Sequence, residues 1–153
     1  MRLTVYTDYS LRLLMYLAVR PEGLATIHEV ATAYKISSNH LMKVAHQLGV
    51  AGYIDTVRGR SGGMRLGRQA DTIGLGEVIR QTEPDMHVVP CLDPENMSCP
   101  LRRACRLKNA LDRARLAFLG VLDEYTLADL VAPPGPIRAF LGLTDQGGGP
   151  AAN

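Results

Sequence analysis

The chain of 153 residues has the size of one compact domain, or of a small domain with an appended helix. Hydrophobic residues make up 46% and charged residues 21%, an ordinary balance for a water-soluble globular protein. No apolar run approaches the ~20 residues of a membrane helix, and the N-terminus lacks the apolar stretch of an export signal. We therefore expect a cytoplasmic protein with no membrane partner, whose odd number of cysteines stays reduced.

The net charge of +2 conceals an asymmetry between the two halves of the chain. Residues 1–70 contain nine Lys or Arg against four Asp or Glu, whereas residues 71–153 contain eight against eleven. A basic half is typical of a surface that meets a polyanion. Because a basic run is usually only a solvated face, this interpretation depends on the elements that carry the charge.

Apolar periodicity predicts a first helix that begins at Thr7, with Asp8 in its positive first turn. A second, short helix is predicted to begin at Thr26, with Glu29 as its partner in a capping box. A third helix follows a tight turn. The residues expected to be buried on these helices are Leu11, Leu14, Met15 and Ala18, then Ile27, Val30 and Ala31, then Leu41, Val44, Ala45 and Leu48.

The second and third predicted helices, joined by a tight turn, are typical of a helix-turn-helix, although a generic helical hairpin has the same pattern. In a helix-turn-helix, polar residues at the start of the later helix contact DNA. Either Ser37 or Ser38 is expected to cap this helix. The candidate contacts are Ser38, Asn39, His40 and Lys43.

Residues 53–57 and 64–66 have strand propensity and flank a loop rich in glycine and arginine, which predicts a β-hairpin. Four arginines and no acidic residue lie between Thr56 and Ala70. Arg58, Arg60 and Ser61 are candidates for contacts to the DNA backbone and minor groove. The predicted fold is therefore mainly α, a winged helix-turn-helix with a small β-hairpin wing.

A long helix is predicted from about residue 104 to residue 125. Its apolar residues at 107, 111, 114, 118, 121 and 125 form a heptad seam, and a second stripe lies at 116, 119 and 122. An ordinary core helix needs one such stripe. Two stripes favour a helix that packs on its own subunit and on a second copy in a homodimer, as proteins that read two half-sites require.

We expect four segments: a DNA-binding domain over 1–82, a cysteine-rich loop over 83–105, a dimerisation helix and docking segment over 104–143, and a disordered tail over 144–153. Within them, short helices are predicted over 75–81, 126–131 and 137–143, and the prolines between 133 and 136 are expected to break the chain.

All three cysteines, Cys91, Cys99 and Cys105, lie within fifteen residues, which makes unrelated thiols a poor explanation. Structural zinc usually needs a closely spaced cysteine pair and four protein ligands, and this chain lacks such a pair. An iron–sulfur cluster tolerates wider spacing, and we favour it over zinc. The local candidates for a fourth ligand are Asp85, His87, Asp93 and Glu95, and a carboxylate from elsewhere could also reach the site.

An enzyme that uses such a cluster for redox or radical chemistry is a further alternative. The chain has no catalytic Ser/His/Asp or nucleotide-binding arrangement and no cysteine spacing typical of radical enzymes. We therefore do not expect an enzyme.

Several motifs resemble those of the iron–sulfur winged-helix repressors grouped with NsrR, IscR and RirA, across nearly all of residues 1–143. They are residues 1–4, 7–12, 38–43, 57–63, 105–111 and 125–131, together with the cysteine triplet. The resemblance implies a homodimeric repressor of double-stranded DNA operators. It is strongest to the nitric-oxide-sensing NsrR-like members.

In those members the resemblance implies a [4Fe-4S] cluster, rather than [2Fe-2S], held by the three cysteines and by an aspartate of the other subunit. The matching aspartate is Asp8 of the partner subunit. IscR-like proteins have a histidine ligand where this chain has Lys108. RirA-like iron sensors share the cysteine spacing but tend to have asparagine at the position of Asp8, so an iron-sensing repressor stays the alternative.

Overall fold

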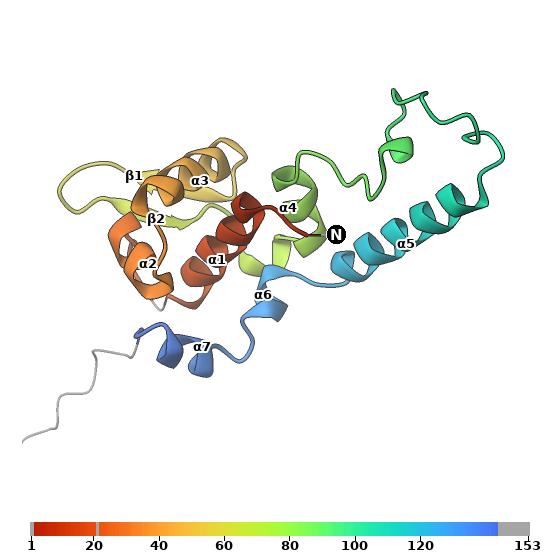
Figure 1. The fold of residues 1–153 in the computed structure, drawn as a ribbon. Coiled ribbons are helices and arrows are strands. Elements are labelled where there is room, and N and C mark those ends of the chain that lie inside the picture. Colours follow the sequence, from red (N-terminus) through yellow and green to blue (C-terminus); the bar gives the residue numbers. More distant parts are fainter. Residues whose placement is uncertain (1, 21, 144–153) are drawn as a thin grey trace, which may run out of the picture.

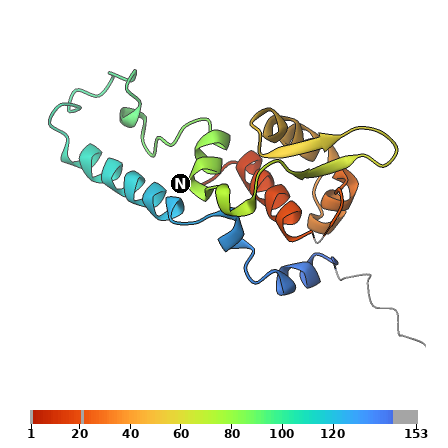
Figure 2. The same cartoon turned by 180° about the vertical axis from the view of Figure 1, so that it is seen from behind.

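The computed structural model describes residues 2–20 and 22–143, which form a helical body with one projecting helix (Figure 1). The elements are α1 (Val5–Val19), α2 (Ile27–Tyr34), α3 (Ser38–Val50), β1 (Ile54–Val57), β2 (Gly63–Leu66), η1 (Ala70–Thr72), α4 (Leu75–Thr82), η2 (Pro90–Leu92), α5 (Arg106–Asp123), α6 (Leu127–Leu130) and α7 (Pro134–Phe140). The views from both sides show α5 extending away from the body, with the loop from α4 beside and beyond its outer end (Figures 1 and 2). No helix in these two ranges is long and apolar enough to cross a membrane.

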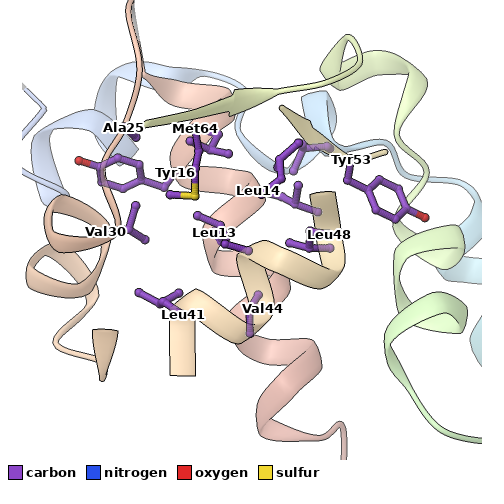
Figure 3. Packing of buried hydrophobic residues seen from close by; sticks show 14 of the residues in the cluster. Leu13, Leu14, Tyr16, Ala25, Val30, Leu41, Val44, Leu48, Tyr53 and Met64 are labelled. Atoms are coloured by element: carbon purple, nitrogen blue, oxygen red, sulfur yellow. The ribbon is translucent and has the colours of Figure 1, made fainter. Parts of the chain in front are cut away.

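Helix α1 runs through the centre of the body and packs against α3, α4, α6 and β2. Its buried side chains meet those of the neighbouring helices and of the hairpin in a single core (Figure 3). The largest fully buried residues include Leu13 and Leu14 of α1 and Leu41 and Leu48 of α3. This core places the start of α3 and the hairpin on the surface of the same body.

The prediction for α1 is wrong at its start and incomplete on its buried face. Thr4 is the N-cap, and its hydroxyl accepts a hydrogen bond from the Thr7 amide at 3.2 Å, while Thr7 itself is fully buried. Because neighbouring elements cover α1 on several sides, it buries Leu13 and Leu17, which the one-sided pattern left out. The predicted residues Leu11, Met15 and Ala18 are only partly buried.

The helix-turn-helix is confirmed by α2 and α3, although Ile27, expected to be buried, is only partly buried. Thr26 and Glu29 form the predicted capping box, in which the Glu29 carboxylate accepts from the Thr26 amide at 2.6 Å. Lys35 takes a left-handed conformation with φ of 54° and ends α2, which makes the turn tight. All four residues expected to be buried on α3 are buried, and Ser37 is its N-cap.

The wing is confirmed as an antiparallel pair of β1 and β2, in register from Ile54 opposite Leu66 to Val57 opposite Gly63. Met64 also exchanges two backbone hydrogen bonds with Ala25, at 2.7 and 2.8 Å, so the hairpin is tied to the segment before α2. Glycine is needed at 63 because a Cβ there would lie 2.7 Å from the Ala25 carbonyl oxygen. The structure therefore has the predicted fold, a mainly helical winged helix-turn-helix with one long helix.

The C-terminal segment differs from the prediction at its prolines. Thr126 and Asp129 form a capping box at the start of α6, which confirms the short helix predicted over 126–131. Helix α7 begins at Pro134 rather than at Ile137, because a proline at the first helical position loses no hydrogen bond. Arg138 of α7 donates to the Val19 carbonyl oxygen at 2.6 Å and docks this helix on α1. The tail predicted to be disordered, 144–153, lies outside the described residues.

Replacing Leu41 by alanine should lower the free energy of unfolding by about 2–5 kcal/mol, because Leu41 of α3 is fully buried in the core. The adjacent Met42 is 52% exposed, so Met42→Ala should change it by no more than about 0.5 kcal/mol. Urea unfolding followed by circular dichroism, at one fixed protein concentration, measures both. Equal losses in the two variants would contradict the assigned core.

Candidate functional site

The start of α3 presents a polar surface to solvent. Ser38, Asn39, His40 and Lys43 are exposed, whereas the opposite side of the same helix is buried in the core. The N-cap residue Ser37 makes no side-chain hydrogen bond to the first turn. Backbone amides and short polar side chains at a helix start are suited to phosphates and base edges. The structure thus brings the four predicted DNA-contact residues to one exposed end of a helix.

Tyr9 of α1 lies beside this surface, a contact that the sequence pattern did not indicate. The centre of its ring is 6.2 Å from the centre of the His40 ring, and the two rings are tilted. Tyr9 and His40 also line a small surface hollow between α1 and α3, together with Val5, Tyr6, Lys43 and Val44. The contact between Tyr9 and His40 therefore joins the start of α1 to the start of α3.

The wing carries its free positive charge at its tip. Arg58, Arg60 and Ser61 lie in the exposed loop between β1 and β2, which extends from the body (Figure 1). In the described ranges neither arginine forms an ion pair, whereas the other two arginines of this basic run do. Arg65 pairs with Asp55 at 3.6 Å and Arg68 with Glu77 at 2.8 Å. Two of the four arginines are thus available at the wing tip for a polyanion.

The three cysteines are free, half-buried thiols distributed along the loop between α4 and α5. Cys91 lies in η2, and Cys105 is the N-cap of α5, where its sulfur accepts a hydrogen bond from the Lys108 amide at 3.3 Å. Across residues 2–20 and 22–143, no three His, Cys, Asp or Glu side chains lie close enough together to hold a metal ion. The donor set fits an iron–sulfur cluster, because three free thiols in one turn-rich loop can wrap it and a backbone amide already reaches one sulfur. The assignment of these cysteines as ligands stays a prediction.

Arg102 organises the cysteine loop, a role that sequence reasoning missed. Its guanidinium donates to the backbone carbonyl oxygens of Asp93 at 3.0 Å, Pro94 at 3.2 Å and Asn96. It therefore braces the turn between Cys91 and Cys99. In the sequence, Arg102 is one of four basic residues close together between 102 and 108, and no spacing distinguishes it from its neighbours.

The candidate fourth ligands do not join the cysteines within one chain. The Asp93 carboxylate accepts from the Glu95 amide, and Asp85 accepts from the His87 amide, both at 2.9 Å. Asp8 lies in the first turn of α1, where it pairs with Arg12 at 2.9 Å and is about half exposed. Asp8 is accessible from outside its own chain, and its predicted role toward a partner subunit stays a prediction.

Comparisons with known proteins agree with this arrangement. A transcriptional regulator NsrR of Bacillus subtilis (strain 168) is 52% identical over 146 residues, which cover 95% of this chain and 100% of that protein. NsrR of Shouchella clausii (strain KSM-K16) is 49% identical over 142 residues, covering 92% of this chain and 95% of the other.

Among solved structures, CymR, the global cysteine regulator of B. subtilis, superposes with a TM-score of 0.70 at 29% identity, over 86% of this chain and 97% of that chain. The structure of T. potens IscR, at 22% identity and a TM-score of 0.69, shares the fold over 90% of this chain and 91% of that chain. Residues 3–133 match the Rrf2 family, which is described as an iron-dependent transcriptional regulator. The chain belongs to the Rrf2 family of transcriptional regulators.

Proposed function

We propose that this chain is a homodimeric transcriptional repressor whose binding to a DNA operator is controlled by a [4Fe-4S] cluster that reacts with nitric oxide. The observation that carries the proposal is that all three cysteines are free thiols in the one loop between the winged domain and α5. The family's description as iron-dependent and the 52% identity to a protein named NsrR support it. We propose no enzymatic activity, because these relatives are named transcriptional regulators.

In this proposal the chain divides its work among successive segments. Residues 1–82 bind DNA through the start of α3 and the tip of the wing. Residues 83–105 hold the cluster, and residues 104–143 supply the dimer helix and the segment that docks on α1. The exposed polar start of α3 supports the first assignment, as do Arg58 and Arg60 of the wing, which form no ion pair within the described ranges.

The surface of α5 supports a homodimer. Within the described chain this helix of 18 residues buries only Leu119. Leu107, Leu116 and Val121 are 66%, 54% and 54% exposed, on stripes that the sequence pattern assigned to packing. Exposed apolar side chains in such a row are typical of a covered interface, and a second copy of the same helix matches the heptad spacing.

The proposed ligands are Cys91, Cys99 and Cys105 of one subunit and Asp8 of the partner subunit. When bound, the cluster supplies an iron site that small diatomic molecules attack, and a carboxylate is a weaker ligand to it than a thiolate. The Asp8 carboxylate would have two competing positive partners. One is the iron held by the partner subunit's loop, and the other is Arg12 of its own helix, which binds it at 2.9 Å. Without the cluster, Asp8 would bind Arg12 alone, and α1 would no longer be held to the partner subunit's loop. Tyr9 of α1 contacts His40 of α3, so this change would occur beside the proposed DNA surface.

An iron-status sensor of the same fold is the second candidate, and the family's description as iron-dependent favours it. The two differ in the signal: loss of the cluster at low iron, or a fast reaction with nitric oxide. An ultraviolet–visible spectrum of the anaerobically purified protein tests both. We expect broad absorbance in the blue that nitric oxide bleaches within the mixing time of the experiment, whereas a colourless zinc protein would contradict the cluster in either form.

Asp8→Ala should weaken cluster binding, because it removes the proposed ligand and leaves only thiolates. We expect cluster absorbance to decay about 10-fold faster or more under a chelator, together with lower operator affinity. Glu22→Ala, which removes an exposed carboxylate of the same domain, is the matched control. Unchanged cluster stability, nitric oxide reactivity and operator affinity in Asp8→Ala would show that Asp8 is no ligand.

Arg60→Ala should weaken DNA binding for all sequences and reduce the slope of log K against log salt concentration by about 1, because one phosphate contact is lost. Arg65→Ala is the control, since Asp55 already compensates the charge of Arg65. Fluorescence anisotropy over a salt series measures both slopes. A slope in Arg60→Ala equal to that of the parent would exclude Arg60 from the interface.

Arg102→Gln should loosen the cysteine loop, because the guanidinium that joins three carbonyl oxygens is lost. We expect the amides of Glu95 and Ser98 to exchange with deuterium about 10-fold faster in the protein without a cluster. Arg103→Gln changes an exposed neighbour and should leave both rates unchanged. Equal rates in the two variants would remove the bracing role of Arg102.

A further inference from the structure

Helix α4 lies between the wing and the long helix, and a charged side chain on α4 contacts each of them. Glu77 contacts the base of the wing, and Arg80, three residues later, contacts the end of α5. Both contacts join residues that are distant in the sequence, across two different elements. Helix α4 has eight residues, so the two contacts are joined by about two turns of rigid helix.

The Glu77 carboxylate holds both ends of the hairpin at once. Its Oε1 atom accepts hydrogen bonds from the Tyr53 hydroxyl at 3.0 Å and from Arg68 at 2.8 Å. Tyr53 directly precedes β1, and Arg68 follows β2 after one glycine, whose amide donates to the Tyr53 carbonyl oxygen at 2.9 Å. The Arg68 guanidinium also lies 4.8 Å from the centre of the Tyr53 ring. The orientation of the wing is thereby tied to α4.

These partners keep their ionisation states near neutral pH. Burial, together with the hydrogen bond to Glu77, raises the pKa of Tyr53 to about 12. The Arg68 hydrogen bond holds the pKa of Glu77 below its usual value. The tyrosine therefore stays a donor and the carboxylate stays an ionised acceptor.

Arg80 and Asp123 form a bidentate pair between α4 and the last residue of α5, with both N–O distances at 2.6 Å. Gly76 allows the pair to lie directly against α4, because a Cβ at this position would be 2.0 Å from the Asp123 Oδ1 atom. Backbone hydrogen bonds from Leu75 to Tyr125 and from Leu127 to Ile73, both 2.8 Å, fix the chain just beyond. The end of α5 thus meets α4 in one defined geometry.

We propose that Glu77 and Arg80 are positioning residues that set the angle between the wing and α5, and so select the spacing of the two half-sites that a dimer reads. This inference rests on the proposed function, in which α5 forms the dimer interface and the wing contacts DNA. Glu77 joins the base of the wing to α4, and Arg80 joins α4 to the end of α5. A change in either contact should therefore alter the angle between the wing and α5 in both subunits. The side chains are about half exposed, so the pairs contribute little to stability while their geometry fixes direction.

The test measures the dissociation constants for two kinds of DNA site. In the first, the two half-sites have the spacing that the parent protein selects; in the second, one base pair is inserted or removed between them. The selected site comes from a random library enriched with the anaerobically purified parent protein. We expect Arg80→Gln and Asp123→Asn to reduce the ratio of the dissociation constants for altered and selected spacing by about 10-fold, a size typical of coupling between sites. Glu77→Gln should reduce the same ratio.

Two controls separate positioning from folding. Asp112→Asn breaks the Asp112–Arg115 pair, at 2.7 Å within α5 alone, and should leave the spacing ratio unchanged. The double exchange Arg80→Asp with Asp123→Arg should recover part of the ratio that either single charge reversal loses. Melting temperature and dimer mass are measured on every variant, and Glu77→Gln and Asp123→Asn decide the question if Arg80→Gln does not fold.

The outcomes distinguish this inference from the proposed function. If the parent protein selects no DNA, the proposed function fails. If the parent selects a site and distinguishes spacing, but folded Glu77→Gln and Asp123→Asn keep the same ratio, only the positioning role fails. A loss of affinity that is equal for all spacings would also overturn it, because a merely structural or charge effect would not change the ratio.

Discussion

The attachment of α5 to the body at one end only is the constraint on which the rest of the structure depends. The Arg80–Asp123 pair and the backbone bridge between Gly74 and Thr126 fix its C-terminal end. Within the described chain, Leu119 is the only buried residue of α5. The outer part of the helix therefore projects with its apolar stripes uncovered (Figures 1 and 2). The cysteine loop is carried at this projecting end, away from the helices that contact DNA in our proposal.

This arrangement explains why the proposed site needs a second subunit. The loop supplies three thiols, and two of the carboxylates near them in the sequence, Asp85 and Asp93, accept hydrogen bonds from local amides. Asp8 is half exposed at the start of α1 in the body of each chain, and the next residue, Tyr9, lines a hollow with His40. A dimer formed through α5 would bring the projecting loop of one subunit toward the body of the other. Chemistry at the loop would then act on α1 and α3 of the partner without a long path through its own chain.

The sequence predicts those parts of the fold that depend on local signals. The capping box of α2, the buried residues of α3 and the two strands of the hairpin follow from short-range patterns, and each is confirmed. The prediction of the buried residues of α1 was incomplete, because several elements cover this central helix and apolar periodicity does not reveal them. Tertiary geometry determines the contacts of Arg102 and the pair of Arg80 with Asp123, which are 43 positions apart. No spacing in the sequence predicts these contacts. Local patterns thus give the candidate ligands and DNA contacts, whose roles stay predictions, whereas the side chains that position these segments did not follow from the sequence.

The most direct test of the account is the affinity of the loaded and the nitric oxide-treated homodimer for the same selected DNA, measured by fluorescence anisotropy under anaerobic conditions at one salt concentration. We expect the loaded dimer to bind about 10- to 100-fold more tightly, within the range of coupling between two sites. The treated protein should remain a folded dimer. Equal affinity of the two forms, with the cluster absorbance lost in one of them, would contradict the claim that the loop at the end of α5 controls DNA binding.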